Sequence, residues 1–506
     1  MPILPRAAYD DRVFIGAIAA AVAIKLVLAL LLPVTGDEAY FIQYGRAVDW
    51  GGFYDHPPMI GWILWLIERI SSHPLVLRLP AIAAALIVAL GLYQLLRPVD
   101  QGRARLLALI LLFSPVYLVN VLVTTDTPLI AFGLLSAVAL QLALRHGRLP
   151  LFAVAGVLLG LAFLSKYFAV LLGVAYLVLI PLAGREHWRG FLLLFASALP
   201  FGLFNLAWNY CHCWNHILFN VFNRAGGSGP SPEGLALYGL MLAYLFALPG
   251  WYLLRERRRL RHELDLTGGG ALVLCGGVPL LLFALVALFF PGGDIGLHWP
   301  LLFVPLVMAA GIGLSQEDLA RGVRFMAWFG GGHALILGGV LAMPVQVFDG
   351  RTIARDAVFY LEPTAYTAAI AEFEGDFHAT DSYARAAVSS YYSRHHWRVF
   401  GTGSRHGRLD DTLTDWREHD GDTMVFLSRD HDIDRDALTP HFTAVEIETF
   451  RAAGQAFEVA RAEDFDYTAY RDSVLREIRD RYYALPHWLP MGGCPFLERY
   501  FPEAVD

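Results

Sequence analysis

Long, uninterrupted runs of apolar residues fill the first two thirds of the chain. Each run is about 16 to 22 residues long, the length at which a helix crosses the hydrocarbon core of a bilayer. The pattern predicts a polytopic α-helical membrane protein with about eleven transmembrane helices. With boundaries soft by several residues, they are expected at 13–33, 76–96, 105–123, 127–144, 150–164, 167–183, 190–208, 234–254, 270–290, 298–314 and 325–345.

Two shorter amphipathic stretches separate the first two runs. Between Asp37 and Trp50 the apolar residues recur at helical spacing, which predicts a helix lying in the plane of the membrane interface. A second interfacial helix, 60–70, is expected after the Pro57-Pro58 break, with two tryptophans at the level of the headgroups. The first loop is therefore expected to lie along the membrane surface.

The character of the chain changes after residue 345. Charged residues become frequent, long apolar runs stop, and short β-like stretches such as 423–427 alternate with helical ones such as 466–485. Roughly 150 residues are a normal size for one soluble α/β domain. We therefore divide the chain into a transmembrane domain, 1–345, and an α/β domain, 346–506.

Arginines determine the expected orientation. The chain has 506 residues, of which 56% are hydrophobic. In its apolar part the arginines collect in alternate loops, and the positive-inside rule predicts that these loops are cytoplasmic. The alternation holds only if 150–183 is two short spans that turn at Ser165-Lys166-Tyr167, which puts Lys166 on the exported side. We expect a multi-pass protein of a bacterial inner membrane, with a cytoplasmic N-terminus and a periplasmic or extracellular α/β domain.

Two kinds of chemistry find no support in the sequence. The four cysteines lack the spacing of a zinc site, and Cys211 and Cys213 are too close for a relaxed disulfide. Gly268-Gly269-Gly270 lacks the Lys-Ser/Thr that a nucleotide-binding loop needs. We therefore expect neither cysteine chemistry nor nucleotide-dependent transport. We also expect no nucleic-acid partner.

Polar residues that are unusual in a membrane protein collect in the exported loops. Their collection on one face argues for a site there, and a carboxylate at the membrane surface suits chemistry on a lipid-borne substrate. These segments are Gly36-Asp37-Glu38, Tyr54-Asp55-His56-Pro57-Pro58, Thr124-Thr125-Asp126, Lys166, the stretch 208–224 and the stretch 294–300.

The order of these motifs resembles that of bacterial GT-C glycosyltransferases. These are the relatives of protein O-mannosyltransferases and of the lipid A aminoarabinose transferase, in glycosyltransferase families 39 and 83. The resemblance covers roughly residues 10–345, and its specificity lies in the ordered set, because each motif alone is weak. The motifs are Gly36-Asp37-Glu38-Ala39-Tyr40, Tyr54-Asp55-His56-Pro57-Pro58-Met59, Arg78-Leu79-Pro80, Thr125-Asp126-Thr127-Pro128-Leu129, Leu164-Ser165-Lys166-Tyr167, Trp208-Asn209 with 214–224, and His298-Trp299-Pro300.

The resemblance implies an inverting transfer of a sugar from a polyprenyl-phosphate carrier to an acceptor on the exported side. Such a displacement needs a base for the proton of the acceptor hydroxyl; Asp37 is the expected base, with Asp126 and Glu38 as further acids of the site. The leaving phosphate needs positive charge or a metal where negative charge develops. The expected contacts to the donor phosphate or the substrate are Lys166, Arg224, Asp55, His56, Tyr54 and His298.

A divalent metal ion stays open as a cofactor. The aminoarabinose transferase has an acidic and then a basic residue before its prolines, whereas this chain has Asp55 and then His56, which makes a metal contact conceivable. His298 is a further weak candidate ligand, although no spacing in the sequence specifies a metal site.

Each acid or lysine of the expected site also has a structural interpretation. Asp37 and Asp126 stand at helix starts, where Asp is a common cap. Lys166 suits a lysine that snorkels to the headgroups, Glu38 suits a solvated neighbour, and Asp55-His56 suits an exposed rigid turn. The sequence leaves these interpretations open beside the catalytic ones.

The remaining histidines and arginines have simpler interpretations still. Isolated histidines near an interface, such as His212, His216 and His298, are more often hydrogen-bonded structural residues. The pair His395-His396 and the arginines of the α/β domain suit a solvated surface, with recruitment of an anionic acceptor as the alternative.

Other classes of protein stay open as well. A lipid-linked glycan transporter or flippase would also be polytopic, although it usually shows repeated halves or broken helices at the membrane midplane. An O-antigen ligase or polymerase would use similar donors, and a catalytically inactive sugar-binding relative would share the motifs. The expected partners are a polyprenyl-phosphate sugar, membrane lipids, and a glycan, lipid or protein acceptor.

Overall fold

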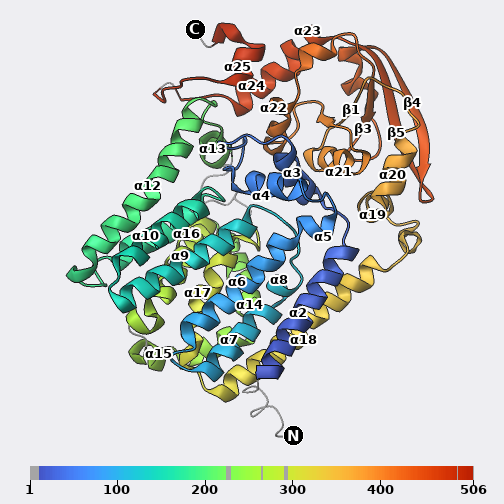
Figure 1. Cartoon of the computed structure of the whole chain (residues 1–506). Coiled ribbons are helices and arrows are strands. Elements are labelled where there is room, and N and C mark those ends of the chain that lie inside the picture. Colours follow the sequence, from blue (N-terminus) through green and yellow to red (C-terminus); the bar gives the residue numbers. More distant parts are fainter. Residues whose placement is uncertain (1–10, 224–229, 264–265, 290–294, 487, 505–506) are drawn as a thin grey trace. The chain divides into compact units, whose positions relative to one another are not determined.

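The computed structural model describes residues 11–223, 230–263, 266–289, 295–486 and 488–504 (Figure 1). The chain forms two compact units. The first comprises Met1–Leu31, Ser71–Asn205 and Ala225–Gly339, and the second comprises Leu32–Ile70, Leu206–Arg224 and Val340–Asp506. The second unit thus combines the C-terminal region with the first loop and with a segment around residue 213.

The first unit is built of helices. Among the described residues, six helical stretches are long and apolar enough to cross a membrane, so the prediction of a polytopic helical membrane protein is confirmed. They are α2 (Asp11–Leu31), α5 and α6 (Pro74–Leu77 and Leu79–Leu96), α9 (Asp126–His146), α12 (Trp188–Tyr210) with the turn before it, α14 (Pro232–Arg255) and α16 (Ala271–Phe289).

Shorter or more polar helices complete the first unit. They are α7 (Gln101–Phe113), α8 (Pro115–Leu118), α10 (Leu149–Phe163), α11 (Ala169–Leu179), α15 (Arg257–Glu263), α17 (Phe303–Met308) and α18 (Gln316–Leu341). The turn expected at Ser165-Lys166-Tyr167 lies between α10 and α11. The prediction of one helix over 105–123 is wrong: the residue before Pro115 is driven into extended backbone, so α7 ends at Phe113. Residues 119–125 then run without helix into α9.

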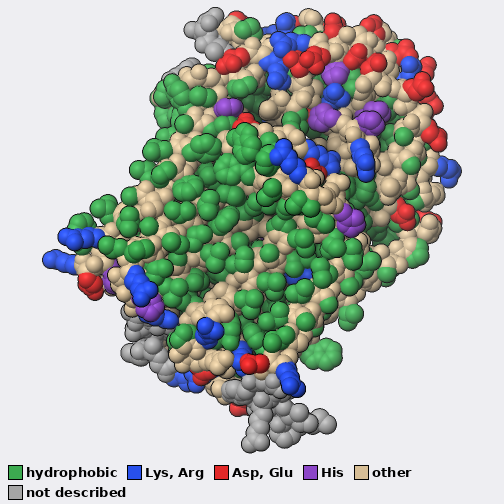
Figure 2. Space-filling model, in the orientation of Figure 1, with side chains coloured by type: hydrophobic (Ala, Val, Ile, Leu, Met, Phe, Trp, Pro, Cys, Tyr) green, Lys and Arg blue, Asp and Glu red, His purple; other side chains and the backbone are tan. Residues whose placement is uncertain are grey.

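The surface of the first unit suits contact with lipid. In the view of Figure 2, apolar side chains cover most of the helices, and lysines and arginines gather toward one end of the bundle. Large apolar residues such as Leu240 and Trp328 are 68% and 84% exposed. Apolar exposure on this scale marks an interaction surface, here a bilayer.

The C-terminal part of the second unit holds a five-stranded mixed sheet, which confirms the predicted α/β class. The strand order is β2-β1-β3-β5-β4, with β1 parallel to β2 and β3 and with β5 antiparallel to β3 and β4. The helix α21 (Tyr383–Ser393) makes the crossover that parallel β1 and β2 require. The strands are β1 (Phe377–Thr380), β2 (Trp397–Val399), β3 (Met424–Leu427), β4 (Phe442–Ala452) and β5 (Gln455–Phe465).

Short helices make up the rest of the second unit. The first loop forms α3 (Gly36–Arg46) and α4 (Met59–Glu68), at the positions expected for the two interfacial helices. The others are α13 (Asn215–Ile217), α19 (Ala354–Leu361), α20 (Pro363–Ile370), α22 (Asp410–Leu413), α23 (Tyr467–Tyr470), α24 (Arg476–Tyr482) and α25 (Pro495–Tyr500).

Candidate functional site

Asp37 is the second residue of α3, and its side chain is exposed. Thr35 occupies the N-cap position of α3, so the interpretation of Asp37 as the cap of this helix is wrong. Within the described residues the carboxylate has one hydrogen bond, from the Tyr383 hydroxyl to Oδ1 at 3.2 Å. Glu38 beside it is 1% exposed, so the interpretation of Glu38 as a solvated neighbour is wrong.

Asp55, which is buried, and His56, which is half-buried, form an acid–histidine pair. The Asp55 side chain is 1% exposed; Oδ1 accepts a hydrogen bond from Tyr44, and Oδ2 lies 3.0 Å from Nδ1 of His56. Burial alone would raise the pKa of Asp55, but His56 and the Tyr44 hydroxyl outweigh it and hold that pKa at about 2. The ionised carboxylate orients the imidazole and leaves Nε2 as its second polar atom. The exposed-turn interpretation is therefore wrong for Asp55.

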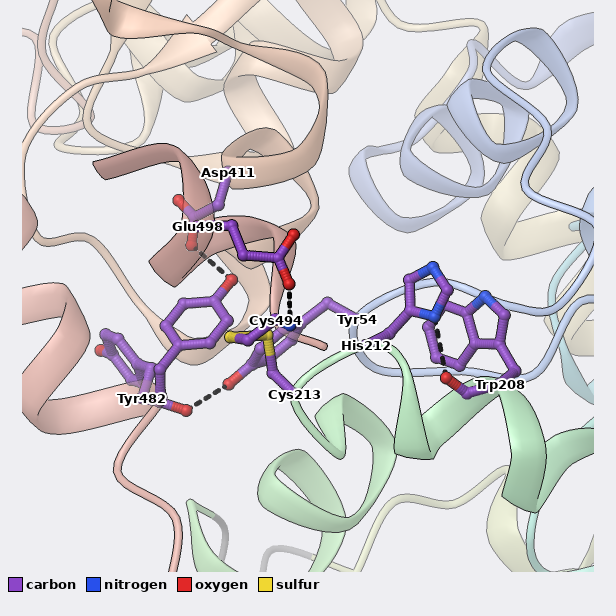
Figure 3. Close-up of a disulfide and its surroundings, with 9 residues drawn as sticks. Tyr54, Trp208, His212, Cys213, Asp411, Tyr482, Cys494 and Glu498 are labelled. Carbon is purple, nitrogen blue, oxygen red and sulfur yellow. Dashed lines mark hydrogen bonds between the residues drawn. A yellow bond between two sulfur atoms is a disulfide. The ribbon is translucent and has the colours of Figure 1, made fainter. Parts of the chain in front are cut away.

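Tyr54 lies in the core of the second unit. Its ring packs edge-on against Phe219 and Tyr483, and its hydroxyl donates to the Tyr482 carbonyl and accepts from Asn223. Figure 3 shows this ring beside the disulfide that joins Cys213 to Cys494, 281 residues apart in the sequence. Substrate binding by Tyr54 stays a prediction, while its packing alone explains an aromatic residue here.

The disulfide was not predicted from the sequence. The expectation that Cys211 and Cys213 do not pair holds, because Cys213 bonds to Cys494 and Cys211 is free. Nearby, the backbone nitrogen of Cys494 donates to Glu498, and Cys213 donates to the carbonyl of Gly493. The bond therefore ties the segment 206–223 to the C-terminal end of the chain.

His216 supports the turn that carries Asp55 and His56. It is fully buried, its Nδ1 lies 3.0 Å from the Asn209 amide, and a Cβ on Gly52 would come within 2.6 Å of its ring. Burial lowers the pKa of His216 to about 3, which keeps the imidazole neutral. The structural interpretation of this histidine therefore holds.

Two residues of the C-terminal part of the second unit, Tyr383 and His406, belong with Asp37 and Phe219. Tyr383 and His406 lie ring to ring with centroids 5.3 Å apart, and the His406 ring also contacts Phe219 at 5.1 Å. Burial lowers the pKa of His406 to about 4. The solvated-surface interpretation of this domain's arginines is wrong for Arg385 and Arg408, which are 4% and 1% exposed.

A second cluster lies in the first unit, where α9 begins. The Lys166 ammonium is 2.9 Å from both oxygens of Asp126, and the two side chains are 11% and 9% exposed. His298 approaches from another segment, with Nε2 3.8 Å from Oδ2 of Asp126. Lys166 is therefore held in a bidentate ion pair, and snorkelling does not describe it.

Lys25 is a buried residue that was not among the site residues predicted from the sequence. It lies inside α2, has no exposed surface, and donates from Nζ to the carbonyls of Tyr117 at 2.7 Å and Asn120 at 2.6 Å. Asn120 and Asp126 line a small cavity of about 20 Å³ beside α6. The sequence did hold a signal for Lys25, because a charged residue inside an apolar run such as 13–33 rarely lacks a role.

Two predictions on ligands stay untested. Arg224 lies outside the described residues. Asp55 and His56 offer only two donors to a metal, and the described part of the chain has no group of three or more His, Cys, Asp or Glu side chains arranged to hold one. These residues alone do not complete a metal site, so we assign no metal-dependent step.

Comparison with known proteins places these clusters in context. Residues 55–208 match the dolichyl-phosphate-mannose-protein mannosyltransferase family. The lipid A galacturonosyltransferase RgtD of Rhizobium johnstonii is 32% identical over 185 residues, which cover 35% of this chain and 38% of that protein. The resemblance to membrane glycosyltransferases is confirmed. The chain thus aligns with well under half the length of its curated glycosyltransferase relative.

The fold is that of solved membrane glycosyltransferases. Two structures of ArnT from Cupriavidus metallidurans, one in the apo state and one bound to undecaprenyl phosphate, match with a TM-score of 0.62 and 13% identity. Each match covers 88% of this chain and 97% of ArnT. The glycosyltransferase family match contains Asp55, His56, Asp126 and Lys166, whereas Asp37 and His298 lie outside it.

Proposed function

We propose that this chain is an inverting glycosyltransferase that moves a sugar from a polyprenyl-phosphate donor to an acceptor on the exported side of the membrane. The observation that carries the proposal is the Asp37 carboxylate, which is exposed at the start of α3 and held by a single tyrosine among the described residues. The names of the relatives support the class: RgtD is a lipid A galacturonosyltransferase, and ArnT has been solved with undecaprenyl phosphate.

In the proposed reaction, Asp37 removes the proton of the acceptor hydroxyl as its oxygen attacks the anomeric carbon of the donor sugar. A new bond forms from that carbon to the acceptor oxygen, and the bond from the carbon to the phosphate oxygen breaks. The leaving polyprenyl phosphate takes the electron pair, and attack on the face opposite the leaving group inverts the configuration. Asp37 keeps the proton until water removes it.

The environments of the three acids favour Asp37 as the base. Asp55 is buried and its charge is committed to Tyr44 and His56. Both oxygens of Asp126 accept hydrogen bonds from Lys166, so neither is left free for an acceptor hydroxyl. Asp37 has no ion pair within the described residues and faces solvent. We assign Asp126 and the buried Glu38 to supporting roles.

We assign the leaving phosphate to groups that donate hydrogen bonds. Lys166 has three N–H donors, and its two contacts to Asp126 leave one for a phosphate oxygen. His56 has Nδ1 beside Asp55, so Nε2 is the ring nitrogen that remains for a phosphate oxygen. His298 and Arg224 remain further proposed contacts, and Asp55 acts through His56.

We further propose about eleven spans, with α7 and α8 together making one span that is broken at Ser114, a cytoplasmic N-terminus, and an exported domain over residues 346–506. The arginine-rich loops support this orientation through the positive-inside rule. The disulfide between Cys213 and Cys494 supports it independently, because disulfides persist in oxidising compartments such as the bacterial periplasm. The acceptor is proposed as lipid A or core oligosaccharide, a protein, or an exported polysaccharide.

The first experiment offers the purified protein in lipid vesicles a panel of polyprenyl-phosphate sugars together with cell-envelope acceptors. Release of polyprenyl phosphate is followed by mass spectrometry for the wild type, for Asp37→Asn, and for Asp49→Asn as a matched acid of the same loop. We expect one donor to turn over, with Asp37→Asn slowed by 10²- to 10⁴-fold, on the order of a lost general base, and Asp49→Asn near the wild type.

Three outcomes would contradict parts of the proposal. No turnover of any donor would favour transport or an inactive sugar-binding protein. Turnover only with a preassembled glycan on its lipid carrier would favour an O-antigen ligase or polymerase. A fully active Asp37→Asn variant would leave the reaction class in place and remove Asp37 as the base.

A further inference from the structure

The helix that carries Asp37 packs closely against the crossover helix α21 of the α/β part. Both α3 and α21 belong to the second unit. At Gly36 the approach is so close that an added Cβ would lie 2.7 Å from the Cβ of Ala384. Just before α3, the backbone nitrogen of Val34 donates to the Tyr392 hydroxyl at 2.8 Å. Residues about 350 positions apart in the sequence are thus packed together around Asp37.

Tyr383 is held rigidly where these helices meet. Its ring stands edge-on to Tyr40, with centroids 5.3 Å apart, and lies against His406 at 5.3 Å on a shallow tilt. Its hydroxyl reaches Oδ1 of Asp37 at 3.2 Å. A ring fixed by two neighbours loses little rotamer freedom on donating a hydrogen bond, so the tyrosine can fix the direction of a carboxylate that is otherwise exposed.

We propose that Tyr383 is a positioning residue for Asp37, which makes the α/β domain a working part of the transferase site. This inference rests on the proposed role of Asp37 as the base. The Tyr383 hydroxyl holds one carboxylate oxygen, so that the other oxygen faces the acceptor hydroxyl in a constant direction. Without the hydroxyl, Asp37 samples several rotamers, and only a fraction of them is aligned for proton transfer.

The test uses Tyr383→Phe, which keeps the ring and its contacts, with Tyr467→Phe in α23 as a matched control. Donor turnover is measured in vesicles as kcat and KM. We expect Tyr383→Phe to lower kcat about tenfold with KM for the donor unchanged, and the control to behave as the wild type. In the Asp37→Asn background, Tyr383→Phe should have no further effect on kcat.

A second pair of variants tests the helix contact itself. Gly36→Ala places a methyl group against Ala384 and should lower kcat, and the further change Ala384→Gly should restore it because the opposing methyl group is removed. A Tyr383→Phe variant with wild-type kcat, or equal effects of Tyr383→Phe with and without Asp37, would overturn the proposal.

Failure of the proposed function has a different signature. If the wild type consumes no donor, melting temperatures of the wild type, Asp37→Asn, Tyr383→Phe and the double variant still report the contact. Non-additive shifts support a coupled Asp37–Tyr383 pair without the transferase reaction, whereas additive shifts overturn the pair as well.

Discussion

The ion pair between Asp126 and Lys166 gives the sharpest stability prediction. Lys166→Met keeps the length and most of the apolar stem of the lysine but removes its charge. The Asp126 carboxylate, 9% exposed with both oxygens on the lysine, would then be buried without its main partner. Breaking a buried pair by removing one partner costs about 3–5 kcal/mol, so we expect a loss of that size in the free energy of unfolding.

The assay is unfolding in mixed detergent–SDS micelles, followed by tryptophan fluorescence. It compares the single variants Lys166→Met and Asp126→Asn with the double variant Asp126→Asn/Lys166→Met. Because the double variant leaves no unpaired charge, we expect it to regain most of the lost stability. Donor turnover should stay low in the double variant, since the proposed phosphate contact is gone. A Lys166→Met variant within about 1 kcal/mol of the wild type would refute the buried-pair reasoning, and a fully active double variant would refute the phosphate contact.

Three further predictions concern the scaffold. Replacing Cys213 and Cys494 by serine should lower the free energy of unfolding by about 2–5 kcal/mol, and a reducing agent should lower the melting temperature of the wild type but not of this variant. Lys25→Met leaves two backbone carbonyls without their donor and should cost about 1–3 kcal/mol in the same unfolding assay; an unchanged value would contradict a structural role for the ammonium. Because the folded pKa of His216 is about 3, below the unfolded value, the stability it contributes is present above about pH 6.5 and is lost as the pH falls toward 3. That loss is roughly 3 kcal/mol by pH 4, and His216→Gln should flatten the pH dependence of unfolding.

Local patterns were enough to predict much of the scaffold. Apolar runs predicted the membrane helices because the length needed to cross a bilayer depends on the run itself. The turn at Lys166 followed from the alternation of arginine-rich loops, and β3 followed from a short β-like stretch. The break at Pro115 was missed because the apolar run continues across it, although the effect of a proline on the preceding residue was a readable signal.

The partners of the site residues could not be predicted in the same way. Asp126 and Lys166 lie 40 positions apart, and their contact depends on how α9 packs against the turn after α10. The disulfide closes 281 residues, and Tyr383 reaches Asp37 across 346 positions. Such pairings depend on tertiary packing, which leaves no period or spacing in one sequence.

The two acid–base pairs, Asp126 with Lys166 and Asp55 with His56, also bear on how the leaving phosphate would be stabilised during transfer. Lys166 is balanced by Asp126, and His56 faces Asp55, so each proposed phosphate donor already has an acid beside it. Unpaired cations would bind the donor and the leaving polyprenyl phosphate with similar strength, and uniform binding of this kind does not speed the chemical step. Paired cations keep a fixed direction and a spare hydrogen-bond donor while attracting the ground-state phosphate less. Their donor bonds strengthen as charge builds up on the leaving oxygen, which is when stabilisation accelerates transfer.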